Sequence, residues 1–263
     1  MAASARRPLI AGNWKMNLDH VAAIRLVQDL ALRLRGFDHE GVDVSVHPPF
    51  TDLRSVEGII GADRLPLLLG AQHCSAHEDG AFTGEVSLGM LARLGVSLVI
   101  VGHSERRQHF AMSDEDVAAT TRAILMKDLI PVICVGETGL EREEGVTDEV
   151  LARQVRAALA GVPAGLESDV VVAYEPIWAI GTGLAATAED AQGACAAIRA
   201  LIAEARGEVA DQVRILYGGS AKPDNAADLV ELADVDGLLV GGASLDAESF
   251  AAIVAAAADC YGR

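Results

Sequence analysis

Eight short runs of consecutive apolar residues recur along the chain and constrain its fold more than any other feature of the sequence. Each run is rich in Val, Ile and Leu and is apolar at successive positions, which is typical of strands buried on both faces of a parallel sheet. The runs start about 25 to 44 residues apart, so each is followed by enough chain for a crossover helix. The predicted strands are Leu9–Ala11, Val42–Val46, Leu67–Leu69, Ser97–Val101, Ile130–Val135, Asp169–Ala173, Val213–Tyr217 and Leu238–Val240.

The segments between these runs have the spacing of amphipathic helices. After Asp19, apolar side chains share one helical face until Gly36 ends the helix, and Ser113 and Thr187 are typical N-cap residues of two later helices. The apolar face after Asp19 consists of Val21, Ile24, Val27, Leu30, Ala31 and Leu34. No linker or composition break divides the 263 residues, and open sheets rarely need eight strands in this length. We therefore predict an α/β fold, a single (β/α)8 barrel domain over residues 1–263, with residues 1–7 as a flexible N-terminal extension.

The charge balance argues against a nucleic-acid or membrane partner. Lys and Arg number 21 against 38 Asp and Glu, and the net charge of −17 repels polyanions and anionic membrane surfaces. The apolar run Phe250–Ala258 is far shorter than the ~20 residues that span a bilayer, and the N-terminus lacks the apolar core of a signal peptide. The four cysteines show no spacing typical of a zinc site. We expect a cytoplasmic protein with reduced thiols.

Polar residues follow five of the predicted strands, at the end of a parallel barrel where active sites form. The segments are Gly12-Asn13-Trp14-Lys15, Gly102-His103-Ser104-Glu105, Tyr174-Glu175-Pro176, Gly218-Gly219-Ser220 and Gly241-Gly242-Ala243-Ser244. The last two are glycine-rich turns, which let backbone N–H groups approach an anion closely, and the loops after strands seven and eight are the usual phosphate site of barrel enzymes. For either turn taken singly, a tight turn that needs glycine for its geometry and binds no ligand is an equally good explanation.

Three side chains in these segments suit acid–base chemistry on an anionic substrate. Lys15 offers a compact positive charge in an acidic protein, although a single lysine is more often a surface residue. His103 begins a predicted helix, whose dipole disfavours the imidazolium and leaves a neutral donor; the alternative is a capping or core histidine. Glu175 ends a buried strand, where burial would raise its pKa and make it a general base, although a structural salt bridge is equally compatible.

An apolar segment, Pro176–Gly183, follows Glu175 directly. Surface loops are normally polar, so an apolar loop with a stiff proline at one end and glycines at the other is typical of a lid that closes over a ligand. A loop packed into the core is the competing interpretation.

Together these motifs resemble the triosephosphate isomerase family. The matching segments occur in the family's order and span essentially the whole chain: GNWKMN (12–17), VGHSERR (101–107), AYEPIWAIGTG (173–183), YGGS (217–220) and LVGGAS (239–244). The resemblance implies a barrel that interconverts dihydroxyacetone phosphate and glyceraldehyde 3-phosphate through an enediol or enediolate, in glycolysis and gluconeogenesis.

The resemblance also implies roles for individual residues. Glu175 matches the base that carries the proton between the two carbons, His103 the neutral electrophile, and Lys15 the cation that stabilises negative charge in the transition state. The substrate-binding residues carried over in this way are Asn13, Lys15, Gly181, Ser220, Gly241 and Gly242, and the supporting residues are Ser104 and Glu105. Neither a metal nor an organic cofactor is implied.

A homodimer is implied as well, in which the loop from Gln72 to Val86 reaches into the twin subunit near its Asn13 and Lys15. Two positions depart from the common family pattern: His73 stands where many relatives have Asn, and Leu184 stands at the trailing hinge of the predicted lid. Neither is a chemical group of the mechanism.

Two other functions compete with this interpretation. One is a different barrel enzyme acting on a phosphorylated sugar, which would share the phosphate turns but not the set of Glu175, His103 and Lys15. The other is a catalytically silent barrel used as a binding or surface-adhesion protein.

Overall fold

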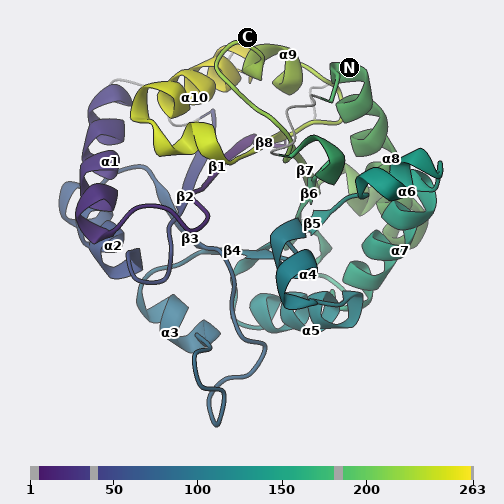
Figure 1. Cartoon of the computed structure of the whole chain (residues 1–263), viewed down its shortest axis with the longest axis horizontal. Coiled ribbons are helices and arrows are strands. Elements are labelled where there is room, and N and C mark those ends of the chain that lie inside the picture. Colours follow the sequence, from purple (N-terminus) through teal and green to yellow (C-terminus); the bar gives the residue numbers. More distant parts are fainter. Residues whose placement is uncertain (1–5, 36–40, 181–185, 262–263) are drawn as a thin grey trace.

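A closed parallel barrel surrounded by helices forms the described part of the chain. The computed structural model describes residues 6–35, 41–180 and 186–261. The barrel strands neighbour one another in chain order and β8 closes on β1 (Figure 1). Their bounds are β1 Leu9–Asn13, β2 Asp43–His47, β3 Leu68–Ala71, β4 Leu98–Val101, β5 Ile130–Val135, β6 Val171–Tyr174, β7 Arg214–Tyr217 and β8 Gly237–Val240. Each predicted strand is confirmed, with bounds that differ by at most two residues.

The helices form an outer ring around the strands (Figure 1). They are α1 His20–Arg33, α2 Leu53–Asp63, α3 Leu88–Arg93, α4 Ser104–Phe110, α5 Asp114–Leu125, α6 Gly139–Glu143, α7 Thr147–Ala160, α8 Ala188–Arg206, α9 Ala226–Val230 and α10 Ala247–Tyr261. Short 3-10 turns lie at η1 Glu167–Asp169, η2 Ile177–Ala179, η3 Gly207–Asp211 and η4 Gly242–Leu245. The predicted caps Ser113 and Thr187 each form a capping box at the start of α5 and α8. Within the described residues, no helix is both long and apolar enough to cross a bilayer.

The buried face of α1 matches the prediction only in part: Val27, Leu30 and Leu34 are buried as predicted. The helix buries Ala23, Leu26, Val27 and Leu30 against α2 and α10, whereas Val21 is 45% exposed. The sequence of α1 is apolar around most of the helix, so its periodicity alone did not define the angle at which the helix packs. Gly36, the predicted end of the helix, lies outside the described residues.

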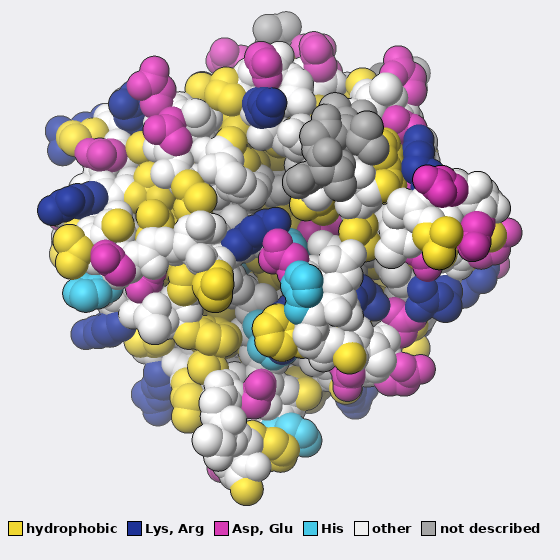
Figure 2. Space-filling view, in the orientation of Figure 1, with side chains coloured by type: hydrophobic (Ala, Val, Ile, Leu, Met, Phe, Trp, Pro, Cys, Tyr) yellow, Lys and Arg dark blue, Asp and Glu magenta, His cyan; other side chains and the backbone are white. Residues whose placement is uncertain are grey.

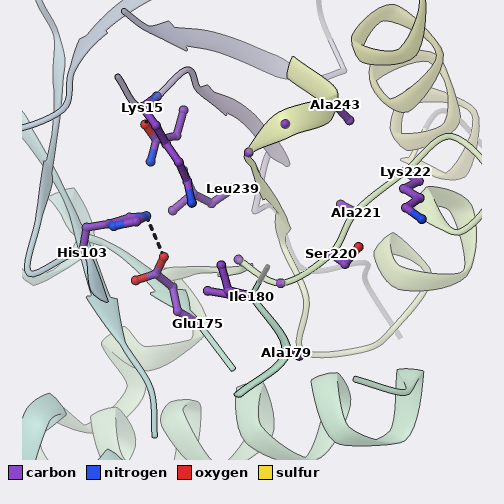
Figure 3. Close-up of a pocket in the computed structure, with 15 residues that line it drawn as sticks. Lys15, His103, Glu175, Ala179, Ile180, Ser220, Ala221, Lys222, Leu239 and Ala243 are labelled. Atoms are coloured by element: carbon purple, nitrogen blue, oxygen red, sulfur yellow. Dashed lines mark hydrogen bonds and ion pairs between the residues drawn. The ribbon is translucent and has the colours of Figure 1, made fainter. Parts of the chain in front are cut away.

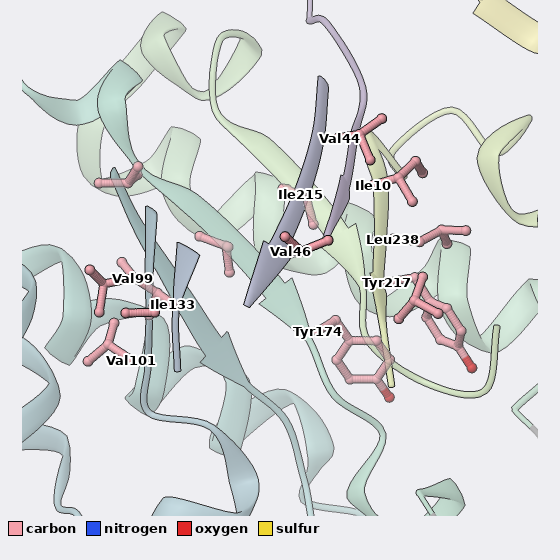
Figure 4. Packing of buried hydrophobic residues seen from close by; sticks show 14 of the residues in the cluster. Ile10, Val44, Val46, Val99, Val101, Ile133, Tyr174, Ile215, Tyr217 and Leu238 are labelled. Atoms are coloured by element: carbon pink, nitrogen blue, oxygen red, sulfur yellow. The ribbon is translucent and has the colours of Figure 1, made fainter. Parts of the chain in front are cut away.

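The core has two layers, because both faces of each strand are buried. Side chains pointing into the barrel form one cluster, which includes Leu9, Ala11, Leu98, Ile100, Val132, Val171 and Leu216. The alternate side chains point outward and pack against the helices; Figure 4 shows ten of them labelled, from Ile10 on β1 to Leu238 on β8. This double burial explains why the strands read as continuous apolar runs.

The first described residues, Arg6 and Arg7, form ion pairs with the barrel. Arg6 Nε lies 2.6 Å from Asp236 Oδ1, and Arg7 Nε lies 3.1 Å from Asp43 Oδ1. Residues 1–5 of the predicted extension lie outside the described residues.

At the opposite end of the strands, one loop projects from the rim. This loop joins β3 to α3 (Figure 1), and apolar side chains gather at its tip and around its base on the face shown in Figure 2. It contains the segment Gln72–Val86 that the resemblance assigns to a subunit contact.

Candidate active site

The carboxyl ends of the strands surround a cavity of about 670 Å³ (Figure 3). It brings together the predicted residues Asn13, Lys15, His103, Glu175, Ser220, Gly241 and Gly242, whose positions in the sequence span more than 200 residues. Gly181 lies outside the described residues. The remaining lining residues are Ala179, Ile180, Gly218, Gly219, Ala221, Lys222, Leu239 and Ala243.

Glu175 lies at the end of β6 and is only 2% exposed. Its Oε2 accepts a hydrogen bond from the Ser104 N–H at 2.9 Å, and its Oε1 lies 2.9 Å from His103 Nε2. Two glycines make room for it: a Cβ at Gly136 would collide with the Glu175 carbonyl oxygen, and one at Gly218 would lie 3.1 Å from the Glu175 Cγ. The backbone around the carboxylate therefore tolerates no larger residue at Gly136 without moving.

The pKa of Glu175 is shifted in the direction opposite to the one expected from burial. Burial raises the pKa of this carboxyl, but the facing His103 imidazole and the Ser104 N–H outweigh it and hold the pKa below its ordinary value. The prediction of a raised pKa is therefore wrong for this arrangement, because the carboxylate has an imidazole and a backbone donor within hydrogen-bonding distance.

His103 is the N-cap of α4, as its place before a predicted helix suggested. Its Nδ1 accepts a hydrogen bond from the Glu105 N–H at 3.2 Å, which leaves Nε2 to carry a proton towards Glu175. Burial lowers the pKa of His103, but the Glu175 carboxylate outweighs it and holds the pKa above its ordinary value. The neutral imidazole was expected from a lowered pKa, and the contact with Glu175 shifts the pKa of His103 in the opposite direction.

Lys15 is held in a strained backbone conformation, with a φ of 53°. Its N–H donates to Asn13 Oδ1 at 3.1 Å, and its carbonyl oxygen accepts from Gln72 Nε2 at 2.7 Å. Its Nζ lies 2.8 Å from Glu105 Oε1, which confirms the predicted proximity of Glu105 to Lys15. These contacts fix the cation on the same side of the cavity as His103 (Figure 3).

The two glycine-rich turns line the cavity on different sides: the turn after β7 begins beside Glu175 at Gly218, and the turn after β8 lies near Lys15. The turn after β8 is closed by Ser244, whose N–H and hydroxyl both donate to the Gly241 carbonyl oxygen, at 2.9 and 2.6 Å. A Cβ placed on Gly241 would lie 3.7 Å from Lys15 Cε, so the lysine stem passes close to this turn. The turn after β7 carries Ser220 and leads into α9.

The described part of the predicted lid is anchored at its leading end. Trp178 Nε1 donates to Glu137 Oε1 at 2.7 Å, and the Arg142 guanidinium stacks 4.0 Å from the Trp178 ring centroid. Ala179 and Ile180 reach the cavity wall. Residues 181–183 of the predicted lid, and Leu184, lie outside the described residues.

Three residues near the site were missed at the sequence level. Gln72 holds the Lys15 carbonyl, Glu137 holds Trp178, and Lys222 lines the cavity. Gln72 and Glu137 come directly or almost directly after β3 and β5, so the rule that polar residues at strand ends face the site would have found them. No group of three or more His, Cys, Asp and Glu side chains able to hold a metal ion occurs among the described residues.

Comparisons with known proteins agree with this geometry. The family model described as triosephosphate isomerase matches residues 8–257. Triosephosphate isomerase of Corynebacterium efficiens is 54% identical over 260 residues, covering 98% of this chain and 99% of the relative. That of Corynebacterium glutamicum is 55% identical over 255 residues, covering 97% and 98%.

A solved structure is similar over the same span. The crystal structure of triosephosphate isomerase from Bartonella henselae superposes with a TM-score of 0.85 and 36% identity, covering 95% of this chain and 98% of that one. Sequence family, curated relatives and fold thus agree over nearly the whole length. The chain belongs to the triosephosphate isomerase family.

Proposed function

We propose that Glu175, His103 and Lys15 carry out the interconversion of dihydroxyacetone phosphate and glyceraldehyde 3-phosphate in this chain. The observation that carries the proposal is the buried pair of Glu175 and His103, 2.9 Å apart, in a cavity that also contains Lys15 and two glycine-rich turns. A carboxylate and an imidazole supply the two proton-transfer groups that an aldose–ketose isomerisation needs.

The reaction moves one proton between neighbouring carbons and one between their oxygens. Glu175 takes the proton from the carbon beside the carbonyl and returns it to the other carbon, with no external oxidant or reductant. His103 Nε2–H donates to the substrate oxygens, and Lys15 stabilises the negative charge that develops on them. Backbone N–H groups at Ser220, Gly241 and Gly242 hold the phosphate, together with Gly181 from outside the described residues.

Substrate binding would remove the contact that contributes to both pKa shifts. When Glu175 leaves His103 to face a substrate carbon, burial acts on each group without its partner. The pKa of the carboxyl then rises, which makes Glu175 a stronger base, while burial and the nearby Lys15 lower the pKa of His103. The same displacement therefore strengthens the base and removes the carboxylate that raises the pKa of His103.

A Glu175→Gln substitution tests this assignment, because it removes the base and nearly conserves volume. We expect kcat to fall at least ~10²-fold with folding unchanged, measured in a coupled assay with glyceraldehyde 3-phosphate. The matched control is Glu115→Gln, which removes an exposed carboxylate on α5 and should leave kcat at the native value. A Glu175→Gln enzyme with near-native kcat would place the base elsewhere and favour a different reaction on a phosphorylated sugar.

We also propose that the chain works as a homodimer. The tip of the projecting loop carries Phe82, 42% exposed and stacked on His77 at a centroid distance of 4.0 Å. Met16, next to Lys15, is 95% exposed, and Met90 and Phe110 are 58% and 64% exposed. Large apolar side chains this open to water are better explained by a partner surface than by solvent, and the loop of a second copy would cover the segment that holds Lys15.

The proposed location is the cytoplasm. The buried cysteines Cys74, Cys134 and Cys195 are free thiols, and burial raises the pKa of Cys74 to about 12. Buried thiols that form no disulfide are typical of a reducing compartment. The described strands belong to one closed barrel, which supports a chain with one domain.

A further inference from the structure

Lys222 lies on the rim of the active-site cavity, and the mechanism above gives it no role. The chain has only three lysines among its 21 basic residues, at positions 15, 127 and 222. Two of these three, Lys15 and Lys222, line the same cavity. Lysine carries a compact charge on a long flexible stem, whereas arginine suits fixed bidentate contacts, so the placement of the rare residue type is informative.

The backbone of Lys222 is fixed although its side chain is exposed. Its N–H donates to Asn225 Oδ1 at 2.8 Å, and Asn225 Nδ2 donates to the Ser220 carbonyl oxygen at 3.0 Å. The Lys222 carbonyl oxygen accepts from the Ala226 N–H at 3.0 Å, which starts α9. The turn that presents the Ser220 backbone to the proposed phosphate position therefore also holds the base of Lys222.

The position of Lys222 is on the outer side of the cavity. Figure 3 shows it beyond Ser220 and Ala221, on the side away from His103 and Glu175. A charge there lies nearer to the turn at Ser220 than to Glu175 and His103.

Lys222 also differs from the other two lysines in its charge environment. Lys15 pairs with Glu105 and Lys127 pairs with Glu78, whereas Lys222 pairs with no carboxylate of the residues described. The whole chain has a net charge of −17, which repels a phosphorylated substrate at a distance. An unneutralised cation at the mouth of the cavity locally opposes that repulsion.

We propose that Lys222 is the outer cation of the phosphate site, which captures the phosphate and guides it to the turns at Ser220 and Gly241. It acts on substrate capture and on the preference for phosphorylated substrates, and it takes no part in proton transfer. This inference rests on the proposed function, because it concerns the phosphate of the same substrate.

The test compares Lys222→Gln, Lys222→Glu and Lys222→Arg with a matched control, Arg122→Gln. Arg122 is exposed in the last turn of α5, and that end of the helix leads to the start of β5, away from the cavity. The control therefore removes the same charge from the opposite end of the barrel. The measurements are kcat and KM for glyceraldehyde 3-phosphate and for unphosphorylated glyceraldehyde, at ionic strengths of about 10 mM and about 300 mM.

For Lys222→Gln we expect kcat/KM for glyceraldehyde 3-phosphate to fall about 3- to 10-fold at low ionic strength, through KM and with kcat unchanged. The loss should shrink below about twofold at high ionic strength, because salt screens an exposed charge. Lys222→Glu should lose more, Lys222→Arg should retain most of the native value, and glyceraldehyde should react equally with all variants. The control should match the native enzyme within about twofold at both ionic strengths.

Other outcomes overturn the inference. A Lys222→Gln enzyme indistinguishable from Arg122→Gln at low ionic strength shows that the charge does not act on capture. A loss that is independent of salt, that extends equally to glyceraldehyde, or that Lys222→Arg does not restore indicates a structural role for the turn instead.

A binding measurement separates this inference from the proposed function. Inorganic phosphate is titrated into native and Lys222→Gln protein by calorimetry, with no turnover involved. Weaker phosphate binding by the variant supports the inference even if the native chain fails to isomerise glyceraldehyde 3-phosphate, which would defeat only the proposed function. Equal binding of phosphate by both proteins at low ionic strength overturns the inference even if the native enzyme is active.

Discussion

His47 illustrates how burial changes the chemistry of a single residue. It lies on β2 with no exposed surface, and its Nδ1 and Nε2 are 3.2 Å from the Ala71 carbonyl oxygen and 3.1 Å from Ser45 Oγ. Any side chain at Gly70 would collide with the imidazole, so the ring fills the space that this glycine leaves. Burial lowers the pKa of His47 to about 4, against a partial opposing effect of the Ala71 carbonyl.

The depressed pKa of His47 predicts that stability falls on mild acidification. The folded protein keeps the imidazole neutral down to about pH 4, whereas the unfolded chain takes up a proton near pH 6.5. The stabilisation is therefore complete above pH 6.5 and is lost as the pH falls towards 4, to a total of about 3 kcal/mol. Urea unfolding between pH 7 and pH 5, above the range in which most carboxylates titrate, should show about 2 kcal/mol of this loss.

The control is a His47→Gln variant, which is less stable overall but lacks this titration. Its free energy of unfolding should depend less steeply on pH in that window than the native one does. Comparing the two slopes cancels the contribution of His103, whose raised pKa acts in the opposite direction. Identical slopes in the two proteins would contradict the prediction.

At the scale of elements, the buried carboxylate of Asp236 bonds to several parts of the barrel, at the end of the strands opposite the active-site cavity. Asp236, just before β8, accepts hydrogen bonds from Arg199 of α8 at 2.7 Å, from Arg6 at 2.6 Å and from the Ile215 N–H of β7 at 2.8 Å. Arg199 also lies 2.6 Å from Asp234. A helix, two strands and the N-terminal segment thus share one ionic network.

We expect Asp236→Ala to lower the free energy of unfolding by about 3 kcal/mol. The substitution leaves the largely buried Arg199 with one carboxylate partner, Asp234, and removes the side-chain acceptor of the Ile215 N–H. Arg6→Gln should cost about 1 kcal/mol, since Asp236 would keep Arg199 and the Ile215 N–H. Urea unfolding measures both, and kcat of folded Asp236→Ala should stay near native because the network lies far from the cavity. Equal losses in the two variants would show that Asp236 does not join the elements in this way.

At the scale of the whole molecule, the exposed apolar side chains around the projecting loop predict association. Sedimentation at micromolar concentration should give the mass of a dimer or a multiple of one. Phe82→Asp places a charge at the tip of the loop and should produce monomers with reduced activity, because the segment of Lys15 and Met16 loses its cover. The control is Leu32→Asp on α1, which changes a similarly exposed side chain, 54% against 42%, away from that loop. A native chain that sediments as a fully active monomer would refute the dimer.

Features encoded within one segment could be predicted from the sequence. The continuous apolar runs identified the strands because double burial leaves its signature on consecutive residues. Ser113 and Thr187 identified helix starts because a cap bonds to backbone only three residues away. The positions of Lys15, His103 and Glu175 followed from a topological rule, since parallel strands deliver their carboxyl ends to the same rim.

Features that depend on contacts between distant segments needed the folded barrel. The pKa of Glu175 is lowered rather than raised because Ser104, 71 positions away, donates to it and His103 lies beside it. The angle of α1 depends on packing against α2 and α10, and the place of Lys222 on the cavity rim depends on its distance from other loops. Local sequence patterns show which residues are apolar or suited to cap a helix. Electrostatic and packing energies depend instead on the distances between side chains from different segments, and only the closed barrel sets those distances.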